Sequence, residues 1–285
     1  MRTFTLKKLL LTTVFFLLGS LAIHAADEED LITEQVTIKL DKAGSLPDKI
    51  DESKKYKITN LKVIGDLNGT DFRLIRDMAG CDYQRKETIG KLSILDLSET
   101  NIVNGGDDYY NDDFSKYSCE NDKIGNSTFD SCNSLTSINL PSSITEIGDY
   151  VFMNCNNLSS ITIPKCVIKI GALAFFDCTA LREIYADWIT PIVIREDVFA
   201  QIFLSSRSLY LYVPKGAIDN YRRTDVWRDF YNIREYVPTD INNTINSYIK
   251  ENSRFSLNGQ RQNQPVKGLN IVKYSDGSVK KVVVK

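Results

Sequence analysis

The chain has 285 residues and a formal net charge of −2, with 35 Lys and Arg against 37 Asp and Glu. A slight acidic excess without basic clusters argues against binding to nucleic acid or to anionic membrane surfaces. The single histidine, His24, lies in the N-terminal leader described next, so the remaining chain has no imidazole for a Ser-His-Asp or Cys-His site or for a His-ligated metal. We expect no catalytic residues, no metal site and no cofactor; a pair of Asp or Glu residues that meet only in the fold stays open as a catalytic alternative.

Residues 1–25 have the features of a secretory signal peptide. Arg2, Lys7 and Lys8 form a positive n-region, residues 9–23 form an apolar h-region, and Ala25 or Ala26 provides a small-residue cleavage position. The apolar stretch is short for a transmembrane anchor, which needs about 17 residues or more, and no cysteine follows it for lipid attachment. Its removal changes the formal charge from −2 to −5. The protein is expected to be exported to the periplasm, the cell surface or the medium.

Residues 26–123 are predicted to form an N-terminal capping region. Residues 31–40 (LITEQVTIKL) alternate like an edge strand, and residues 42–55 are expected to be a loop with a short helix. Two further strand signals follow, in which Leu61 and Leu95 are 34 residues apart, long enough for a true helix between them. Asp71 is the expected N-cap of that helix, and Gly80 is expected to end it.

Residues 104–122 are the most polar stretch of the chain, and we expect a solvated surface loop. Asp107, Asp108, Asp112 and Asp113 suggest calcium as an alternative, but the Asp-x-Asp-x-Asp-Gly order followed by a Glu is missing. A loop of this length in a compact array is often used for binding.

From residue 124 one pattern is written three times: IGNSTFDSCNSLTSINLP, IGDYVFMNCNNLSSITIP and IGALAFFDCTALREIYAD. Corresponding residues are spaced 23 apart, which is typical of a solenoid whose coils bury their apolar faces against one another. The six repeated columns are Ile124/147/170, Gly125/148/171, Phe129/152/175, Cys132/155/178, Leu135/158/181 and Ile138/161/184.

Each coil is expected to contribute one short strand with alternating side chains, so Ile138 and Leu140 point inward and Asn139 points outward. The repeated cysteines are interpreted as buried thiols that act as small hydrophobes, although their spacing of about one strand, ~4.8 Å, would reach a disulfide. A bridge between Cys81 and Cys119, outside this column, is also conceivable.

The third copy has Asp187 where the others have proline, which indicates decay toward a C-terminal cap. Leu209 to Val213 are expected to form a last strand, and Ile218, Tyr221, Trp227 and Phe230 are expected to share one side of a covering helix. Trp227 could instead stack on a sugar. Residues 124–237 thus comprise the repeats and their cap.

Residues 238–253 are polar and Asn-rich, and we expect a linker. Residues 254–285 are predicted to be a small β unit, because Asn258-Gly259 and Asp276-Gly277 are pairs that tight hairpin turns prefer. The expected strands are 255–257, 269–272 and 279–284.

The pattern IGxxxFxxCxxLxxIxIP resembles the BspA-like leucine-rich repeats of exported proteins from Bacteroides and its relatives. The VPxG…Y…W..F..I sequence at 213–233 is similar to the terminal module of such arrays, and the tail is similar to a short C-terminal segment of Bacteroidetes exported proteins. The tail is shorter than the sorting domains of type IX secretion. The resemblance implies adhesion to host or bacterial surfaces, although fold alone does not fix function. The predicted fold is an α/β solenoid with 23-residue repeats, two caps and a β-hairpin unit.

The leading hypothesis is a binding module, without catalysis, whose outward strand positions contact a surface protein or glycan. An accessory subunit for polysaccharide capture and a self-associating surface protein are the alternatives, the latter through the edge at residues 31–40. The candidate ligand-binding residues are Thr136, Asn139, Ser160, Thr162, Arg182 and Tyr185.

Overall fold

The computed structural model describes residues 30–112, 114–202, 204, 206–237, 251–256, 260–262, 264, 266–274 and 279–284. The expected signal peptide, residues 1–25, lies outside this part of the chain. Across the described ranges, no helix is both long enough and apolar enough to span a bilayer.

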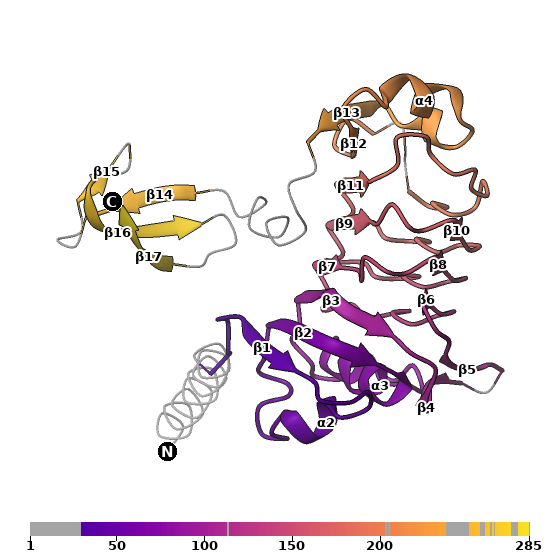
Figure 1. The fold of residues 1–285 in the computed structure, drawn as a ribbon, viewed down its shortest axis with the longest axis horizontal. Helices are drawn as coiled ribbons and strands as arrows, with labels where there is room; N and C mark the ends of the chain where they lie inside the picture. Colours follow the sequence, from indigo (N-terminus) through magenta and orange to yellow (C-terminus); the bar gives the residue numbers. More distant parts are fainter. Residues whose placement is uncertain are drawn as a thin grey trace, which may run out of the picture.

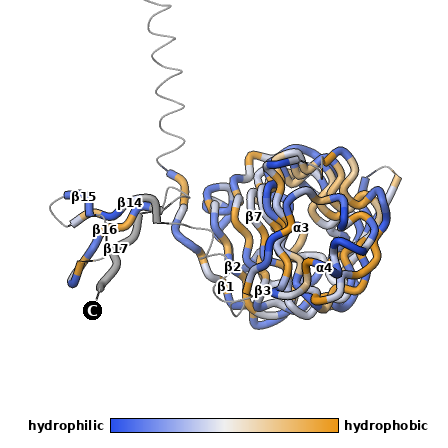
Figure 2. The backbone as a smooth tube through the Cα atoms, turned by 90° about the horizontal axis from the view of Figure 1, so that it is seen from above, coloured by the Kyte–Doolittle hydropathy of each residue, from blue (hydrophilic) through white to orange (hydrophobic). Residues whose placement is uncertain are grey.

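Stacked coils form the body of the molecule, with an eight-stranded parallel sheet on one side and a three-stranded parallel sheet on another (Figure 1). Strand order follows chain order from the first coil to the last, and the coils superimpose when viewed along the stack (Figure 2). The chain therefore has a repeat fold of solenoid type. The large sheet contains β1 (Val36–Lys39), β2 (Asn60–Leu67), β3 (Ile94–Ile102), β7 (Ser137–Asn139), β9 (Ser160–Ile163), β11 (Glu183–Ala186), β12 (Tyr210–Pro214) and β13 (Asn232–Tyr236); the small one contains β6 (Lys123–Ile124), β8 (Glu146–Ile147) and β10 (Lys169–Ile170).

The register of the large sheet confirms the 23-residue period. Ile138 pairs with Ile161, and Ile161 pairs with Ile184, so one repeat column becomes one row of buried side chains. The row continues toward the N-terminus through Leu95 and Leu61, which pair with each other as their spacing predicts. The longer coil between them joins the stack without breaking this row.

A ladder of phenylalanines fills the interior of the coils. The rings of Phe129, Phe152 and Phe175 stack in parallel at centroid separations of 5.4 and 5.3 Å, and all three are fully buried. The ladder continues to Phe199 at 5.2 Å. A fourth coil thus follows the three expected from the sequence. Its Ile194 and Phe199 come 24 residues after their counterparts in the third coil, where the period of the earlier coils is 23, and Arg195 stands in place of the glycine.

The repeated glycines allow neighbouring coils to approach closely. A Cβ atom at Gly148 would lie 2.5 Å from the Asn126 side chain, and one at Gly171 would lie 2.3 Å from that of Asp149. Those same side chains bind the next coil, since Asn126 Oδ1 accepts a hydrogen bond from the Asp149 amide at 2.9 Å. The fourth coil has Arg195 at this position, and the three-stranded sheet ends before it, at β10.

The repeated cysteines are free, buried thiols, as expected. The Sγ atoms of Cys155 and Cys178 donate hydrogen bonds of 3.0 Å to the carbonyl groups of Phe129 and Phe152 in the preceding coil. Cys81 and Cys119 are also free, so the conceivable bridge between them does not form.

We expect only one of the six thiols to react quickly with a disulfide reagent in the native protein. Cys166 is exposed, whereas the other five are buried. Burial raises the pKa of the Cys132 and Cys178 thiols to about 12, which suppresses the reactive thiolate. Titration with Ellman's reagent before and after denaturation in guanidinium would check this. Two or more fast equivalents in the native state would contradict the burial of these five thiols.

The N-terminal region contains α2 (Leu46–Lys49) and α3 (Gly69–Met78). The expectation that Asp71 is the N-cap of α3 is wrong: Asn68 is the N-cap, and Asp71 at N3 completes a capping box. The fully buried Asp71 carboxylate accepts further bonds from the amides of Gly44 (2.6 Å) and Leu46 (2.9 Å). It therefore joins α3 to the segment at α2. Burial raises the pKa of Asp71, opposed by these bonds.

Residues 104–122 do not form the expected surface loop. They form an antiparallel hairpin of β4 (Gly105–Asn111) and β5 (Lys116–Cys119). Although the segment is polar overall, the side chains of Tyr109 and Tyr110 are buried. The Tyr109 ring packs edge-on against Phe72 of α3 at 6.1 Å. The polar side chains face solvent while the tyrosines close the core.

Arg76 of α3 joins the N-terminal region to the first coil. Its fully buried guanidinium donates hydrogen bonds to the carbonyl groups of Ser127 (2.8 Å), Thr128 (2.9 Å) and Asp130 (3.2 Å). It also donates to the Asp82 carbonyl at 3.0 Å. One side chain thus satisfies carbonyl groups from two segments that are about fifty positions apart.

The C-terminal end differs from the expected single helix. Two short helices, α4 (Ile218–Arg223) and the 3-10 helix η1 (Trp227–Asp229), cover the last coil. β13 follows them and is the last strand of the eight-stranded sheet. The strand expected at residues 209–213 therefore corresponds to β12, the last strand but one. The Trp227 indole is fully buried and donates to the Ile192 carbonyl at 2.8 Å. The alternative of a sugar-stacking platform at Trp227 is therefore wrong.

Replacing Asp187 with asparagine should stabilise the protein at neutral pH. Its half-buried carboxylate has no hydrogen-bond partner for Oδ1, and burial raises its pKa to about 6, with Lys165 opposing. Because the folded-state pKa lies above the unfolded value, stability falls as pH rises from about 4 to 6 and stays reduced above it. We expect Asp187→Asn to add about 1–2 kcal/mol at pH 7.

Urea unfolding of native protein and Asp187→Asn at pH 4 and pH 7 would check this expectation. The difference between the two proteins should largely vanish at pH 4, where the carboxyl is protonated in the folded state. An equal difference at both pH values would point to packing instead.

The tail forms a four-stranded antiparallel sheet in the order β15-β14-β16-β17. Its first strand begins at Glu251, inside the expected linker 238–253, and the predicted turns at 258–259 and 276–277 lie outside the described residues. The Asn270 amide donates to the carbonyl groups of Val266 and Gly268. The strands are β14 (Glu251–Phe255), β15 (Arg261–Gln262), β16 (Gly268–Tyr274) and β17 (Val279–Val284).

Candidate functional site

The outer face of the eight-stranded sheet brings outward residues of successive coils into rows. One row runs through Asn139, Thr162, Tyr185, Tyr212 and Arg234, each paired in register with the next. The neighbouring row runs through Ser137, Ser160, Glu183, Tyr210 and Asn232. The sheet thus orders residues from distant parts of the chain at strand spacing.

The structure places three of the six candidate residues, Asn139, Thr162 and Tyr185, in the first row and Ser160 in the second. Two of these side chains are less accessible than expected: Asn139 is 8% exposed and Tyr185 is 9% exposed. Both stand on the outward row, but neighbouring side chains cover them. The expectation that Asn139 and Tyr185 are exposed outward residues is therefore wrong.

Thr136 and Arg182 lie just before their strands. The Thr136 hydroxyl donates to the Ser93 carbonyl at 3.0 Å, so it ties one coil to the preceding one. The exposed Arg182 guanidinium bonds to the carbonyl groups of Thr179 (3.0 Å) and Leu181 (2.8 Å). Thr136 thus joins two coils, whereas the bonds of Arg182 lie within its own coil.

A tyrosine cluster, consisting of Tyr185, Tyr210, Tyr212 and Tyr236, occupies the C-terminal part of this face. The rings of Tyr185 and Tyr212 stack at 4.5 Å, and Tyr236 contacts the Tyr185 ring edge-on at 5.3 Å. The Tyr210 ring lies 6.1 Å from that of Tyr212. Interface centres are enriched in tyrosine and arginine, so this is the region of the face best suited to a partner.

Two charged residues border the tyrosine cluster. The Arg234 guanidinium lies over the Tyr210 ring, 4.3 Å from its centroid. Glu183 Oε2 accepts a hydrogen bond from the Tyr185 hydroxyl at 3.3 Å. Burial raises the pKa of Tyr212, with Glu183 as the next contribution, so its hydroxyl remains a hydrogen-bond donor at neutral pH.

The sequence offered part of the signal for this cluster. The segment SLYLYVP alternates like a strand and places Tyr210 and Tyr212 on one face. Arg234 and Tyr236 were missed, because the last strand was expected at residues 209–213 and no strand was expected at residues 232–236.

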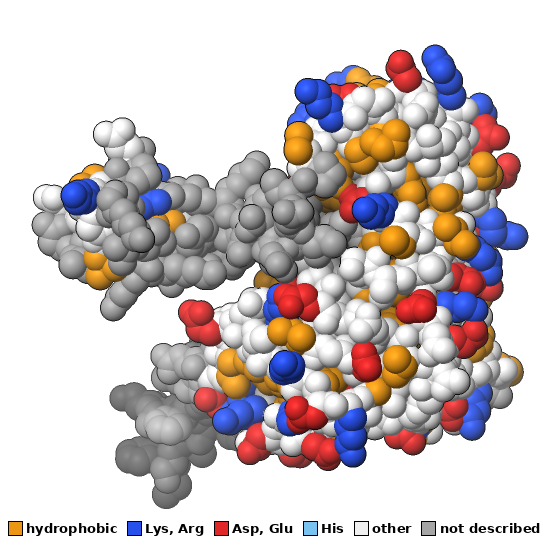
Figure 3. Space-filling view, in the orientation of Figure 1, with side chains coloured by type: hydrophobic (Ala, Val, Ile, Leu, Met, Phe, Trp, Pro, Cys, Tyr) orange, Lys and Arg blue, Asp and Glu red, His pale blue; other side chains and the backbone are white. Residues whose placement is uncertain are grey.

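The N-terminal part of the face is charged. Lys62 Nζ lies 2.5 Å from Glu99 Oε1 and 3.5 Å from Asp96 Oδ2. The hydrogen bond with Glu99 is the first cause of a raised Lys62 pKa. In the space-filling view, charged side chains of both signs are dense over the N-terminal part of the molecule, while the middle coils show mainly uncharged surface (Figure 3).

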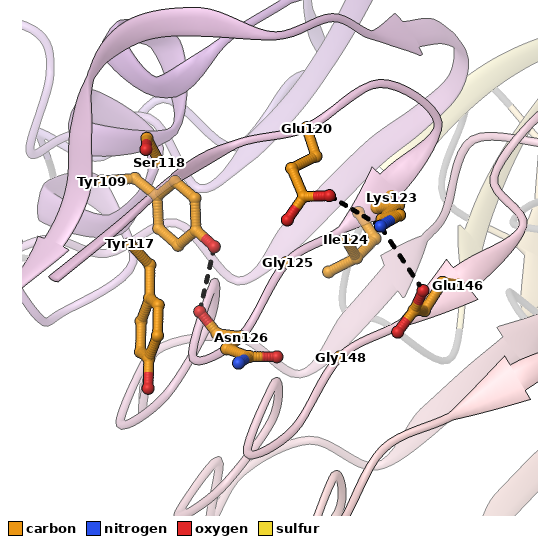
Figure 4. Close-up of a pocket in the computed structure, with 10 residues that line it drawn as sticks. All are labelled: Tyr109, Tyr117, Ser118, Glu120, Lys123, Ile124, Gly125, Asn126, Glu146 and Gly148. Carbon is orange, nitrogen blue, oxygen red and sulfur yellow. Dashed lines mark hydrogen bonds and ion pairs between the residues drawn. The ribbon is translucent and has the colours of Figure 1, made fainter. Parts of the chain in front are cut away.

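A small cavity lies where the hairpin meets the first coils (Figure 4). It measures about 80 Å³, well below the several hundred cubic ångströms typical of a ligand site. Lys123 Nζ bridges Glu120 at 2.6 Å and Glu146 at 3.7 Å, and the Tyr109 hydroxyl donates to the Asn126 carbonyl at 3.0 Å. These contacts join β4 and the residue after β5 to β6, β8 and the turn after β6, and we assign the cavity a structural role.

The hairpin carboxylates do not gather as a calcium site would require. Asp108 pairs with Lys116 at 2.8 Å, Asp107 accepts a bond from the Thr70 hydroxyl, and Asp112 caps the amides of the turn. Asp113 is outside the described residues. Over the part of the chain that the structure describes, no three His, Cys, Asp or Glu side chains are placed to hold a metal ion.

Residues 108–211 match the family model of the BspA type leucine rich repeat region, with six copies. No curated protein matches the chain. The match runs from the hairpin through the 23-residue coils into β12, and it supports leucine-rich repeats of the BspA type in this part of the chain. Repeats of this type suggest a role in interactions with other proteins.

Proposed function

We propose that this is an exported binding protein that presents the outer face of its eight-stranded sheet to a partner at the cell surface, as an adhesin or interaction module without catalysis. The tyrosine cluster carries the proposal, because it concentrates the residue types of interface centres on an ordered strand face. The BspA-type repeats support an interaction role. The signal-peptide pattern of residues 1–25 supports export.

A binding screen of residues 26–285 against immobilised matrix proteins and glycans tests the proposal. A hit should be saturable and should weaken at least about tenfold when Thr162 and Tyr212 are replaced by alanine. Tyr150→Ala is the matched control, since Tyr150 follows β8 on the other sheet of the coil. If Tyr150→Ala weakens binding as much as the double replacement does, or if the double replacement leaves binding unchanged, the partner does not bind at the outer face.

A further inference from the structure

At least one ring face of Tyr185, of Tyr212 and of Tyr210 is already in contact with a neighbour. Tyr185 is covered by the Tyr212 ring at 4.5 Å and an interplanar angle of 8°, with Tyr236 at its edge. The Tyr210 face holds the Arg234 guanidinium at 4.3 Å. A sugar stacks on an open ring face, so this cluster is a poor sugar platform. What it offers to solvent is ring edges, hydroxyl groups and one cation.

That cation interacts with tyrosines and with no carboxylate among the described residues: it lies over the Tyr210 ring and also contacts the Tyr212 hydroxyl. Arg234 is exposed, and within the described residues its guanidinium makes no ion pair. The two nearest carboxylates along the strands are engaged elsewhere: Glu235 Oε1 accepts a bond from the Gly216 amide at 2.9 Å, and Glu183 accepts the Tyr185 hydroxyl. The Tyr210 ring holds the guanidinium in place, which lowers the entropy cost of binding an anion.

The cluster also adjoins an open sheet edge. β13 pairs only with β12 in the described sheet, so half of its backbone groups have no strand on the other side. An extended chain can pair with such an edge through its main chain and place alternate side chains over the adjacent face. Tyr212 and Arg234 are neighbours in register there.

We propose that the tyrosine cluster and the edge of β13 bind an extended polypeptide that carries a carboxylate side chain, which Arg234 contacts. The inference rests on the proposed function and names its partner class. Arginine is the residue best matched to a carboxylate, through two parallel hydrogen bonds. The tyrosine edges and hydroxyl groups contact the remaining peptide.

The test uses a phage-displayed library of random 12-residue peptides, selected on residues 26–285, with a panel of neutral and anionic polysaccharides as a second probe. Selected peptides are synthesised, and their Kd is measured by fluorescence anisotropy for the native protein, Arg234→Gln and Tyr212→Ala. Arg195→Gln is the matched control, because Arg195 is an exposed arginine of the fourth coil that pairs with Asp197. Thermal unfolding verifies that each variant folds.

Peptides rich in Asp or Glu are expected, with Kd raised about tenfold by Arg234→Gln and by an Asp→Asn change in the peptide. The two changes together should cost no more than one alone, since they remove the same contact. Arg195→Gln should change Kd less than twofold.

Peptide binding that needs Tyr212 but not Arg234 would overturn the carboxylate contact and leave the proposed face intact. Polysaccharide binding that needs Tyr212 would overturn the peptide inference. Binding that ignores both residues would overturn the inference and the proposed function together.

Discussion

Phe152→Ala is expected to lower the free energy of unfolding by about 3–5 kcal/mol. The Phe152 ring is fully buried between those of Phe129 and Phe175, at 5.4 and 5.3 Å. Its removal takes both stacking contacts away and leaves a cavity in the middle of the array. The cavity should persist, because strand pairing fixes the distance between the adjacent coils. Urea unfolding followed by circular dichroism measures the loss.

Phe114→Ala provides the control, since Phe114 is 95% exposed at the tip of the hairpin. It should change stability by less than about 0.5 kcal/mol. If Phe152→Ala costs no more than Phe114→Ala, the phenylalanine ladder does not stabilise the stack.

Arg76→Ala is also expected to cost about 3–5 kcal/mol, for a different reason. The fully buried guanidinium bonds to carbonyl groups of Asp82, Ser127, Thr128 and Asp130. Alanine removes this donor from all four; the Asp82 and Ser127 carbonyls still accept from the amides of Arg85 and Asp130, whereas those of Thr128 and Asp130 lose the bond that the guanidinium supplied. The N-terminal region should then separate from the first coil at a lower urea concentration than in the native protein. Hydrogen exchange of the α3 backbone amides, measured at increasing urea concentrations, would detect this separation.

Arg76→Lys separates charge from geometry. A lysine keeps the positive charge but cannot reach four carbonyl groups with one ammonium, so most of the loss should remain. Arg228→Ala, at an exposed arginine paired with Asp225, is the control and should change stability by less than about 0.5 kcal/mol. Full stability of Arg76→Lys would show that charge alone matters.

The repeats could be predicted from sequence because each column has one physical cause. The isoleucine rows, the stacked phenylalanines and the buried cysteines all follow from identical residues that stack at strand spacing. The fourth coil could not be recognised from the 23-residue period, because Arg195 replaces the glycine of the column and Phe199 comes 24 residues after Phe175. Its phenylalanine stacks nonetheless, since the ladder tolerates a one-residue insertion in the coil.

Other features depended on contacts that a sequence does not display. Tyr109 and Tyr110 lie in a stretch of aspartates, and only the packing of β4 against α3 shows that they are buried. The outer face was placed correctly in register, but Asn139 and Tyr185 are covered by neighbours from other coils. The tyrosine cluster required β13 to be a strand, which the aromatic pattern at 221–233 obscured.

The outer face as the binding surface is the central claim, and hydrogen–deuterium exchange with a bound partner tests it most directly. Residues 26–285 would be labelled alone and with a saturating amount of a protein or peptide from the screens. We predict slowed exchange in β11, β12 and β13 and unchanged exchange in β6, β8 and β10. Protection confined to the three-stranded sheet or to the hairpin would contradict the claim.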